Sequence, residues 1–133
     1  MLKKIIPCLL LVLLCGCTRK EYPPCANQPL ENVVSIELLE NMEVICTLPE
    51  SEFEAFWADF MAIKFHRFLS DPPTEYGDLA VKITYADGYY DIIGQNVNWY
   101  FTPTGKGANT KVYYAVNKED FVTLFATYTE NQQ

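Results

Sequence analysis

The fold is decided by residues 79–94, which read LAVKITYADGYYDIIG. Two runs that alternate apolar and polar side chains flank the pair Asp87-Gly88. This pair suits a two-residue type I′ turn, because both central positions of that turn need a positive φ. The sequence therefore predicts a β-hairpin over Leu79 to Gly94.

The length of the loop decides which side chains share a face of this hairpin. A two-residue loop separates an apolar face from a polar one, whereas a three-residue loop would pair Ile83 with Asp91 and mix them. We expect the two-residue loop, which pairs Tyr85 with Tyr90 and Ile83 with Ile92. The predicted apolar face carries Val81, Ile83, Tyr85, Tyr90 and Ile92, and the predicted polar face carries Lys82, Thr84, Tyr89 and Asp91.

Further strands are predicted on both sides of the hairpin. Residues 32–39 and 43–48 form a first hairpin around Glu40-Asn41-Met42, with Val34, Ile36 and Leu38 on one face. Lys64 to Leu69 either prolongs a helix or forms a strand, and we prefer the strand. Val97 to Thr102 and Lys111 to Val116 continue the alternation, joined by a loop over residues 103–110 and completing a four-strand meander.

Two amphipathic helices are predicted from a spacing of i, i+3, i+4 and i+7. Ser51 and Glu54 have the spacing of a capping box at the start of the first helix. Asn117 is the predicted N-cap of the second helix, Lys118 to Tyr128. The two apolar faces consist of Phe53, Phe56, Trp57 and Phe60, and of Phe121, Leu124, Phe125 and Tyr128.

These elements indicate an α+β fold: an antiparallel sheet, made of a hairpin plus a four-strand meander, with two amphipathic helices packed on one face. The 133 residues, half of them apolar, fit one domain, which we place at residues 33–129, followed by a polar tail at 130–133. A net charge of −7 opposes binding to nucleic acid.

The N-terminus has the composition of an export signal. Lys3 and Lys4 precede an apolar run over residues 5–14, which is too short for a membrane-spanning helix. The run ends in Leu14-Cys15-Gly16-Cys17, which resembles the lipobox of bacterial lipoproteins. The resemblance covers the first 17 residues and leaves the rest of the chain unassigned. The alternatives are an ordinary secretory signal and an uncleaved anchor.

The resemblance implies that Cys17 is acylated and becomes the N-terminus after cleavage behind Gly16. The chain from Cys17 on would be anchored in the lipid bilayer on the extracytoplasmic side of the cell membrane, because two acyl chains give stable anchoring. It would carry eight Lys and Arg against 17 Asp and Glu, a formal charge of −9. We interpret residues 17–32, which hold three prolines, as an extended tether that keeps the domain clear of the headgroups.

Two cysteines, Cys25 and Cys46, remain once the signal and the acylated residue are set aside. A disulfide between them would close a loop of about 20 residues and contribute roughly 3 kcal/mol. The alternative is a buried thiol at Cys46, which lies on the inward face of its strand. The sequence favours neither. No metal site or cofactor is expected, because one His and two distant Cys lack the spacing of a zinc site.

No catalytic residues are predicted. His66 and Ser70 would be close on a helix, but Asp71 is poorly placed to orient the imidazole. The segment Gly105-Lys106-Gly107 departs from the phosphate-binding motif and leads into a strand. Asp71, Glu75 and Asp78 lack the spacing of a calcium-binding loop, so a solvated acidic loop is the preferred interpretation.

The aromatic residues of the meander are the most suggestive functional feature. In the predicted register, Tyr89, Tyr100 and Tyr113 share the polar face with Lys82, Lys111 and Asp91. Such a face is typical of protein interfaces and glycan platforms, although cross-strand packing is the simpler explanation of tyrosines in strands. We expect a non-enzymatic binding module for an envelope or secreted protein or a glycan. The alternative is an envelope-associated enzyme or enzyme inhibitor.

Overall fold

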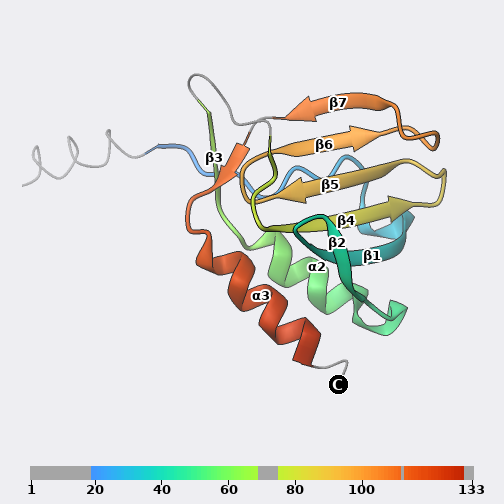
Figure 1. Ribbon diagram of the computed structural model, residues 1–133, viewed down its shortest axis with the longest axis horizontal. Helices are drawn as coiled ribbons and strands as arrows, with labels where there is room; N and C mark the ends of the chain where they lie inside the picture. The colour runs from blue at the N-terminus through green and yellow to red at the C-terminus, as the bar shows by residue number, and fades with distance from the viewer. Residues whose placement is uncertain (1–18, 69–74, 112, 131–133) are drawn as a thin grey trace, which may run out of the picture.

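The computed structural model describes residues 19–68, 75–111 and 113–130. A six-stranded antiparallel sheet has the order β2-β1-β4-β5-β6-β7, and β3 and β8 form a second sheet (Figure 1). With two α-helices, this confirms the predicted α+β class. The elements are η1 (Leu30–Asn32), β1 (Val33–Glu40), β2 (Glu43–Thr47), η2 (Glu50–Glu52), α2 (Phe53–Met61), β3 (Phe65–Arg67), β4 (Leu79–Tyr85), β5 (Tyr90–Gly94), β6 (Asn98–Phe101), β7 (Gly107–Lys111), β8 (Tyr113–Ala115) and α3 (Glu119–Glu130).

The first hairpin is confirmed and closes tightly. Its two-residue turn, Asn41-Met42, has φ values of 50° and 66°. Ile36 and Leu38 are buried as expected, but Val34 is 57% exposed. The prediction for Val34 is wrong because the pairing of β1 with β4 shifts between Val33 and Ser35, which breaks the alternation at that residue.

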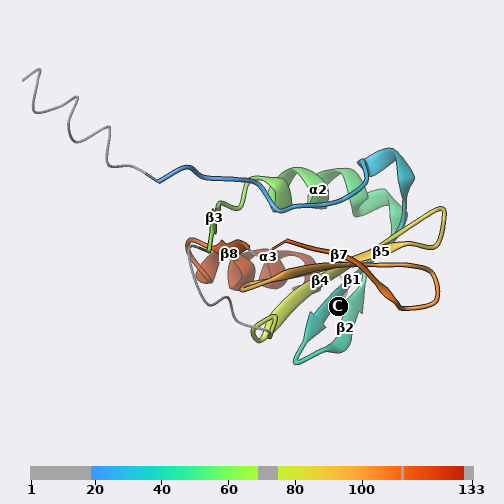
Figure 2. The same cartoon turned by 90° about the horizontal axis from the view of Figure 1, so that it is seen from above.

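Both helices contribute aromatic side chains to one large core cluster. The ring centroid of Phe56 on α2 lies 5.0 Å from that of Tyr128 on α3, and the centroid of Phe60 on α2 lies 6.0 Å from that of Phe121 on α3. The same cluster contains sheet residues such as Ile83. Figure 2 shows α2 running alongside the sheet at a distance from it, with the N-terminal segment passing on the same side. The apolar spacing of the two helices is therefore confirmed as a core-forming pattern.

The helix starts differ from each other. Asn117 caps α3 as predicted, since its side-chain oxygen accepts a hydrogen bond from the backbone N–H of Glu119 at 3.1 Å. The capping box at Ser51 and Glu54 does not form. The chain makes the 3₁₀ turn η2 first, so that α2 begins at Phe53 and Ser51 lies inside that turn.

The last strands depart from the predicted meander. Lys64 to Leu69 does contain a strand, β3, but its partner is β8. The fourth strand of the meander is Gly107–Lys111, most of which we expected to be a loop. A tight turn with Gly105 at φ 85° returns the chain early enough for these residues to pair with β6. Residues 113–115 then pair with β3, so the prediction of one strand over residues 111–116 is wrong.

Candidate interaction surface

The turn of the β4–β5 hairpin sets the geometry of the surface. The backbone N–H of Gly88 donates to the carbonyl of Tyr85 at 2.9 Å, and the N–H of Tyr85 donates to the carbonyl of Tyr89 at 2.8 Å. Gly88 has φ 88°, whereas Asp87 has no positive φ. This is a three-residue loop over residues 86–88, a turn followed by a glycine bulge, and it pairs Ile83 with Asp91. The predicted two-residue loop is wrong.

The sequence of β5 explains why alternation misjudged the register. Tyr89-Tyr90-Asp91-Ile92-Ile93 has a similar apolar pair on each side of Asp91. A slip of one residue exchanges Tyr90 for Tyr89 and Ile92 for Ile93, so the apolar content of each face hardly changes. The register therefore depends on the face of the sheet to which the carboxylate of Asp91 belongs.

Asp91 lies on the core face, where it is 0% exposed. Its carboxylate accepts hydrogen bonds from the hydroxyl of Tyr85 at 2.5 Å and from the backbone N–H of Asn27 at 2.8 Å, and a third from the side-chain amide of Asn27. Burial, followed by the nearby carboxylate, raises the pKa of the Tyr85 hydroxyl. These donors compensate the cost of burying the carboxylate.

The segment that carries Asn27 is packed against the domain. Tyr22 exchanges two backbone hydrogen bonds with Phe65 of β3 at 2.9 and 2.8 Å. Gln28 donates to the hydroxyl of Tyr100 at 2.7 Å and to the carboxylate of Asp87. We call residues 19–32 the strap. The prediction that this part of the chain is an extended tether is wrong, because these contacts hold it across the core face.

The observed register places a different set of aromatic residues on the opposite side of the sheet, the outer face. Cross-strand pairs there join Ile92 to Trp99 and Tyr90 to Phe101. The rings of Tyr90 and Phe101 lie 4.9 Å apart at an angle of 17°, and those of Phe101 and Trp99 lie 6.3 Å apart at 21°. All three rings are partly exposed. We call Tyr90, Trp99 and Phe101 the ring row.

Charged and apolar groups border the ring row. The ammonium group of Lys82 lies 4.7 Å from the ring centroid of Tyr90 and 3.8 Å from a carboxylate oxygen of Glu37. Beneath the rings, a small second cluster of buried residues contains Leu39, Ala80 and Ile92.

Tyr76 packs against the same small cluster, beside Gly94. A side chain at Gly94 would meet the Cβ and the carbonyl oxygen of Tyr76 at 2.5 Å, so this close approach requires glycine. Burial raises the pKa of Tyr76 to about 12, with a smaller contribution from Tyr90.

The three tyrosines predicted as a surface do not form one. Tyr100 pairs with Asp91 on the core face, and the ring centroid of Tyr89 lies 5.3 Å from that of Tyr100. Both pack against the large core cluster, as does Tyr113, whose ring lies 5.1 Å from that of Tyr22. The prediction that they share an exposed face is wrong. The sequence neighbours of Tyr89 and Tyr100 form the ring row instead.

The strand order does not bring Cys25 and Cys46 together. Cys25 lies beside Asn98 of β6, since the side chain of Asn98 donates a hydrogen bond to the carbonyl of Cys25. Cross-strand pairing leads from Asn98 through β5, β4 and β1 to Cys46 on β2. Four strand spacings separate the two ends, about 19 Å, whereas a disulfide needs Cα atoms within about 7 Å. Cys46 is a buried thiol whose pKa is raised by burial, with a smaller contribution from Glu52.

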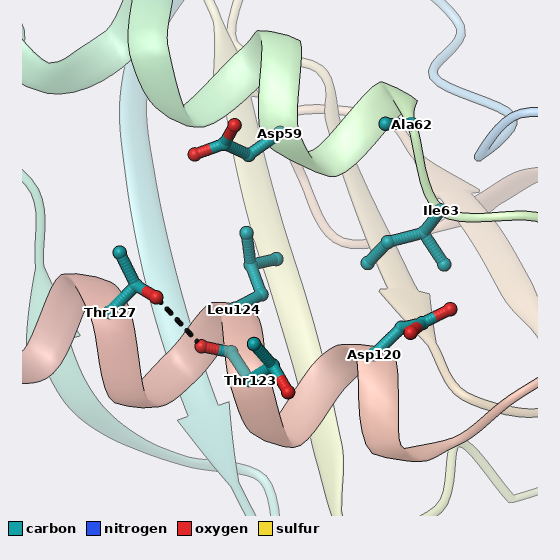
Figure 3. A pocket seen from close by; sticks show the side chains of 7 residues that line it. All are labelled: Asp59, Ala62, Ile63, Asp120, Thr123, Leu124 and Thr127. Atoms are coloured by element: carbon teal, nitrogen blue, oxygen red, sulfur yellow. Dashed lines mark hydrogen bonds between the residues drawn. The ribbon is translucent and has the colours of Figure 1, made fainter.

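Three of the shallow cavities on the molecule are lined by described residues. One of about 250 Å³ lies between α2 and α3, where Asp59 faces Leu124 and Thr127 (Figure 3). Asp59 accepts a hydrogen bond from the hydroxyl of Tyr128 at 2.6 Å. Two others, of about 320 and 430 Å³, share Gln95 and Val122. None of the three is lined by His66.

The structure describes only some of the other candidate residues. His66 lies on β3 with its ring 5.9 Å from that of Tyr114, while Ser70 and Asp71 lie outside the described residues. Gly105 and Lys106 form the turn into β7, so no helix follows them. Within residues 19–68, 75–111 and 113–130, no three His, Cys, Asp or Glu side chains are grouped so that they could hold a metal ion.

Comparison with protein-family models, with curated proteins and with solved structures finds no match for this chain. Cys17 lies outside the part of the chain that the structure describes. Among the helices of that part, none has the length and apolar character needed to cross a membrane.

Proposed function

We propose that this chain is a binding protein, not an enzyme, that is anchored through acylated Cys17 on the extracytoplasmic side of the cell membrane and binds its partner through the ring row. In this proposal the two helices cover the core face, which leaves the outer face for binding. The partner is a protein or a glycan of the cell envelope or its surroundings.

The ring row carries the proposal. Tyr90, Trp99 and Phe101 come from two adjacent strands, and their order is fixed by backbone pairing. Aromatic rings held rigidly contribute contact area at a low cost in conformational entropy, which is why interfaces are enriched in them. Lys82 at the border adds a cation whose carboxylate neighbour, Glu37, keeps the local charge balanced.

Binding is tested on the double variant Trp99→Ala/Phe101→Ala of the chain from residue 17 on. The probes are soluble peptidoglycan fragments and an envelope protein extract with chemical cross-linking. We expect the variant to lose the ligand that the wild type captures. Val122→Ala, which shortens an exposed side chain of α3, is the control and should bind like the wild type.

A spectroscopic version of the test uses the Trp57→Phe background, in which Trp99 is the remaining tryptophan. A ligand that docks on the ring row changes the fluorescence of Trp99, and the response saturates with ligand. Equal capture by the double variant and the wild type, with both folded by circular dichroism, would remove the ring row from the proposal.

The anchor is tested separately by mass spectrometry of the protein from its own host. We expect the N-terminal residue to be Cys17 carrying acyl chains. A chain that retains Met1, or an unmodified thiol at Cys17, would contradict the anchor while leaving the ring row open to its own test.

A further inference from the structure

Basic side chains gather where the strap enters the fold. The chain that follows Cys17 has eight Lys and Arg in all. Half of them lie on the first residues of the strap or on and beside β3, where Tyr22 pairs with Phe65. These four, which we call the basic end, are Arg19, Lys20, Lys64 and Arg67.

The start of the strap is fixed to the small β3–β8 sheet. The guanidinium of Arg19 donates to the hydroxyl of Tyr114 on β8 at 2.6 Å and to the carbonyl oxygen of Arg67 on β3 at 2.6 Å. Two residues of chain span at most about 7 Å. An acylated Cys17 would therefore hold the basic end within a few ångströms of the bilayer surface.

The side chains of the basic end remain available for a partner. Arg19, Lys20 and Arg67 are exposed, and the side chain of Lys64 is 68% exposed although it lies 3.5 Å from a carboxylate oxygen of Glu21. Within the described part of the chain, Glu21 is the acid that is paired with one of these four cations, so this end is positive, whereas the chain from Cys17 on is strongly acidic as a whole. The positively charged part of the domain therefore lies beside the proposed anchor.

We propose that the basic end docks on anionic phospholipid headgroups of the membrane that holds Cys17, so that the domain sits on the bilayer in one orientation with β3 and β8 facing the lipid. The proposal rests on the anchor proposed above. It replaces the expectation that a tether keeps the domain clear of the headgroups, because the strap is packed against the domain and the positive charge of the basic end lies beside the anchor.

Aromatic side chains at the same end fit an interfacial position. The ring of Tyr22 packs against that of Tyr113, and the cations of Lys20 and Arg19 lie 5.2 and 5.8 Å from the ring centroids of Tyr22 and Tyr114. Tyrosine combines an apolar ring with a polar hydroxyl, which suits the headgroup region of a bilayer. Cations and tyrosines together point to a phospholipid surface.

The test measures lysine acetylation by a water-soluble reagent on vesicles, residue by residue, by mass spectrometry. A hexahistidine tag replaces residues 1–17 and binds a nickel-chelating lipid, so the chain is anchored at the same point whatever happens to Cys17. All described elements lie within the remaining chain. The vesicles contain phosphatidylcholine alone or with phosphatidylglycerol.

With phosphatidylglycerol we expect Lys20 and Lys64 to react several times more slowly than on neutral vesicles, and high salt to abolish the difference. Lys106, in the β6–β7 turn at the other end of the sheet, should react equally on both (Figure 1). Arg67→Glu lowers the charge of the basic end by two units and should weaken docking about 30-fold. Lys106→Glu, with the same change in net charge, should leave it intact.

Equal reaction rates of Lys20 and Lys64 on both vesicle types would overturn the proposal. Protection of Lys106 as strong as that of Lys64 would also overturn it, because the basic end would then not be the docking face. The tag supplies the anchor in this experiment, so an unmodified Cys17 in the native protein would contradict the proposed function without changing this result.

Discussion

Two hairpins of the large sheet, β1–β2 and β4–β5, have the opposite turns to those that their sequences favour. Asn41-Met42 contains no glycine and forms a two-residue turn with two positive φ values. The β4–β5 hairpin contains Asp87-Gly88, the better sequence for that turn, and forms a three-residue loop. A turn sequence is therefore a weak determinant of register when the strands and their partners require another pairing.

The difference lies in what each hairpin must bury. The first hairpin places Ile36 and Leu38 in the core by simple alternation, and Met42 adopts a strained φ to allow it. In the second hairpin both faces of β5 are apolar apart from Asp91. The hydrogen bonds to Asp91 from Tyr85 and Asn27 therefore select the register.

Removing that carboxylate has the largest expected effect. Asp91→Ala leaves the buried hydroxyl of Tyr85 and two part-buried donors of Asn27 without their acceptor and should lower the free energy of unfolding by about 4 kcal/mol. Denaturant unfolding measures it. Asp87→Ala, which removes an exposed acceptor of the same type from the turn, should cost about 1 kcal/mol. Equal losses in the two variants would show that Asp91 does not select the register.

The glycine of the bulge has the next largest effect. Gly88→Ala places a side chain at φ 88° and 3.1 Å from the ring of Pro103, and should cost about 1.5 kcal/mol by thermal unfolding. Gly105→Ala is the control, because Gly105 has φ 85° but meets only the Tyr90 hydroxyl, at 3.5 Å. A smaller loss at Gly88 than at Gly105 would contradict the close packing of the loop.

Alkaline pH should weaken the second hairpin through Tyr85. Because burial beside Asp91 raises the pKa of this hydroxyl, its contribution to stability is complete below about pH 10, where the unfolded tyrosine begins to ionise, and is lost as the pH rises further. The stability difference between wild type and Tyr85→Phe should shrink by about 1.4 kcal/mol between pH 8 and pH 11. A difference independent of pH would contradict the buried hydrogen bond.

Relief of strain in the first hairpin is the smallest effect. Met42→Gly creates Asn-Gly, the preferred sequence for this turn, and should raise the free energy of unfolding by about 0.5 kcal/mol after the entropy cost of glycine. Met42→Ala keeps the strained φ and should bring no gain. Because Met42 is 49% exposed, little packing is lost in either variant.

Local patterns predicted the parts of the fold that depend on local physics. The apolar faces of both helices and the Asn117 cap involve residues within a few turns of each other, so their spacing is visible in the sequence. The first hairpin was predicted for the same reason. These elements identify the class of the fold.

The candidate surface could not be predicted because it depends on a distant contact. Asn27 reaches Asp91 across 64 positions of the chain, and without it the burial of a carboxylate on the core face is unexpected. The wrong register then exchanged Tyr90 for Tyr89 and placed Tyr100 on the outer face. The aromatic composition of the meander did indicate a surface, but not which rings form it.

The strap also determines the order in which this chain can complete its structure. Its residues are synthesised before those that receive them, since Asn27 and Cys25 precede their partners Asp91 and Asn98 by 64 and 73 positions. The strap must therefore wait for β5 and β6, and its closure requires ordering a long loop. Until then the carboxylate of Asp91 is open to water on the side that the strap later covers. A chaperone or protease that meets the chain during synthesis would find the strap unprotected.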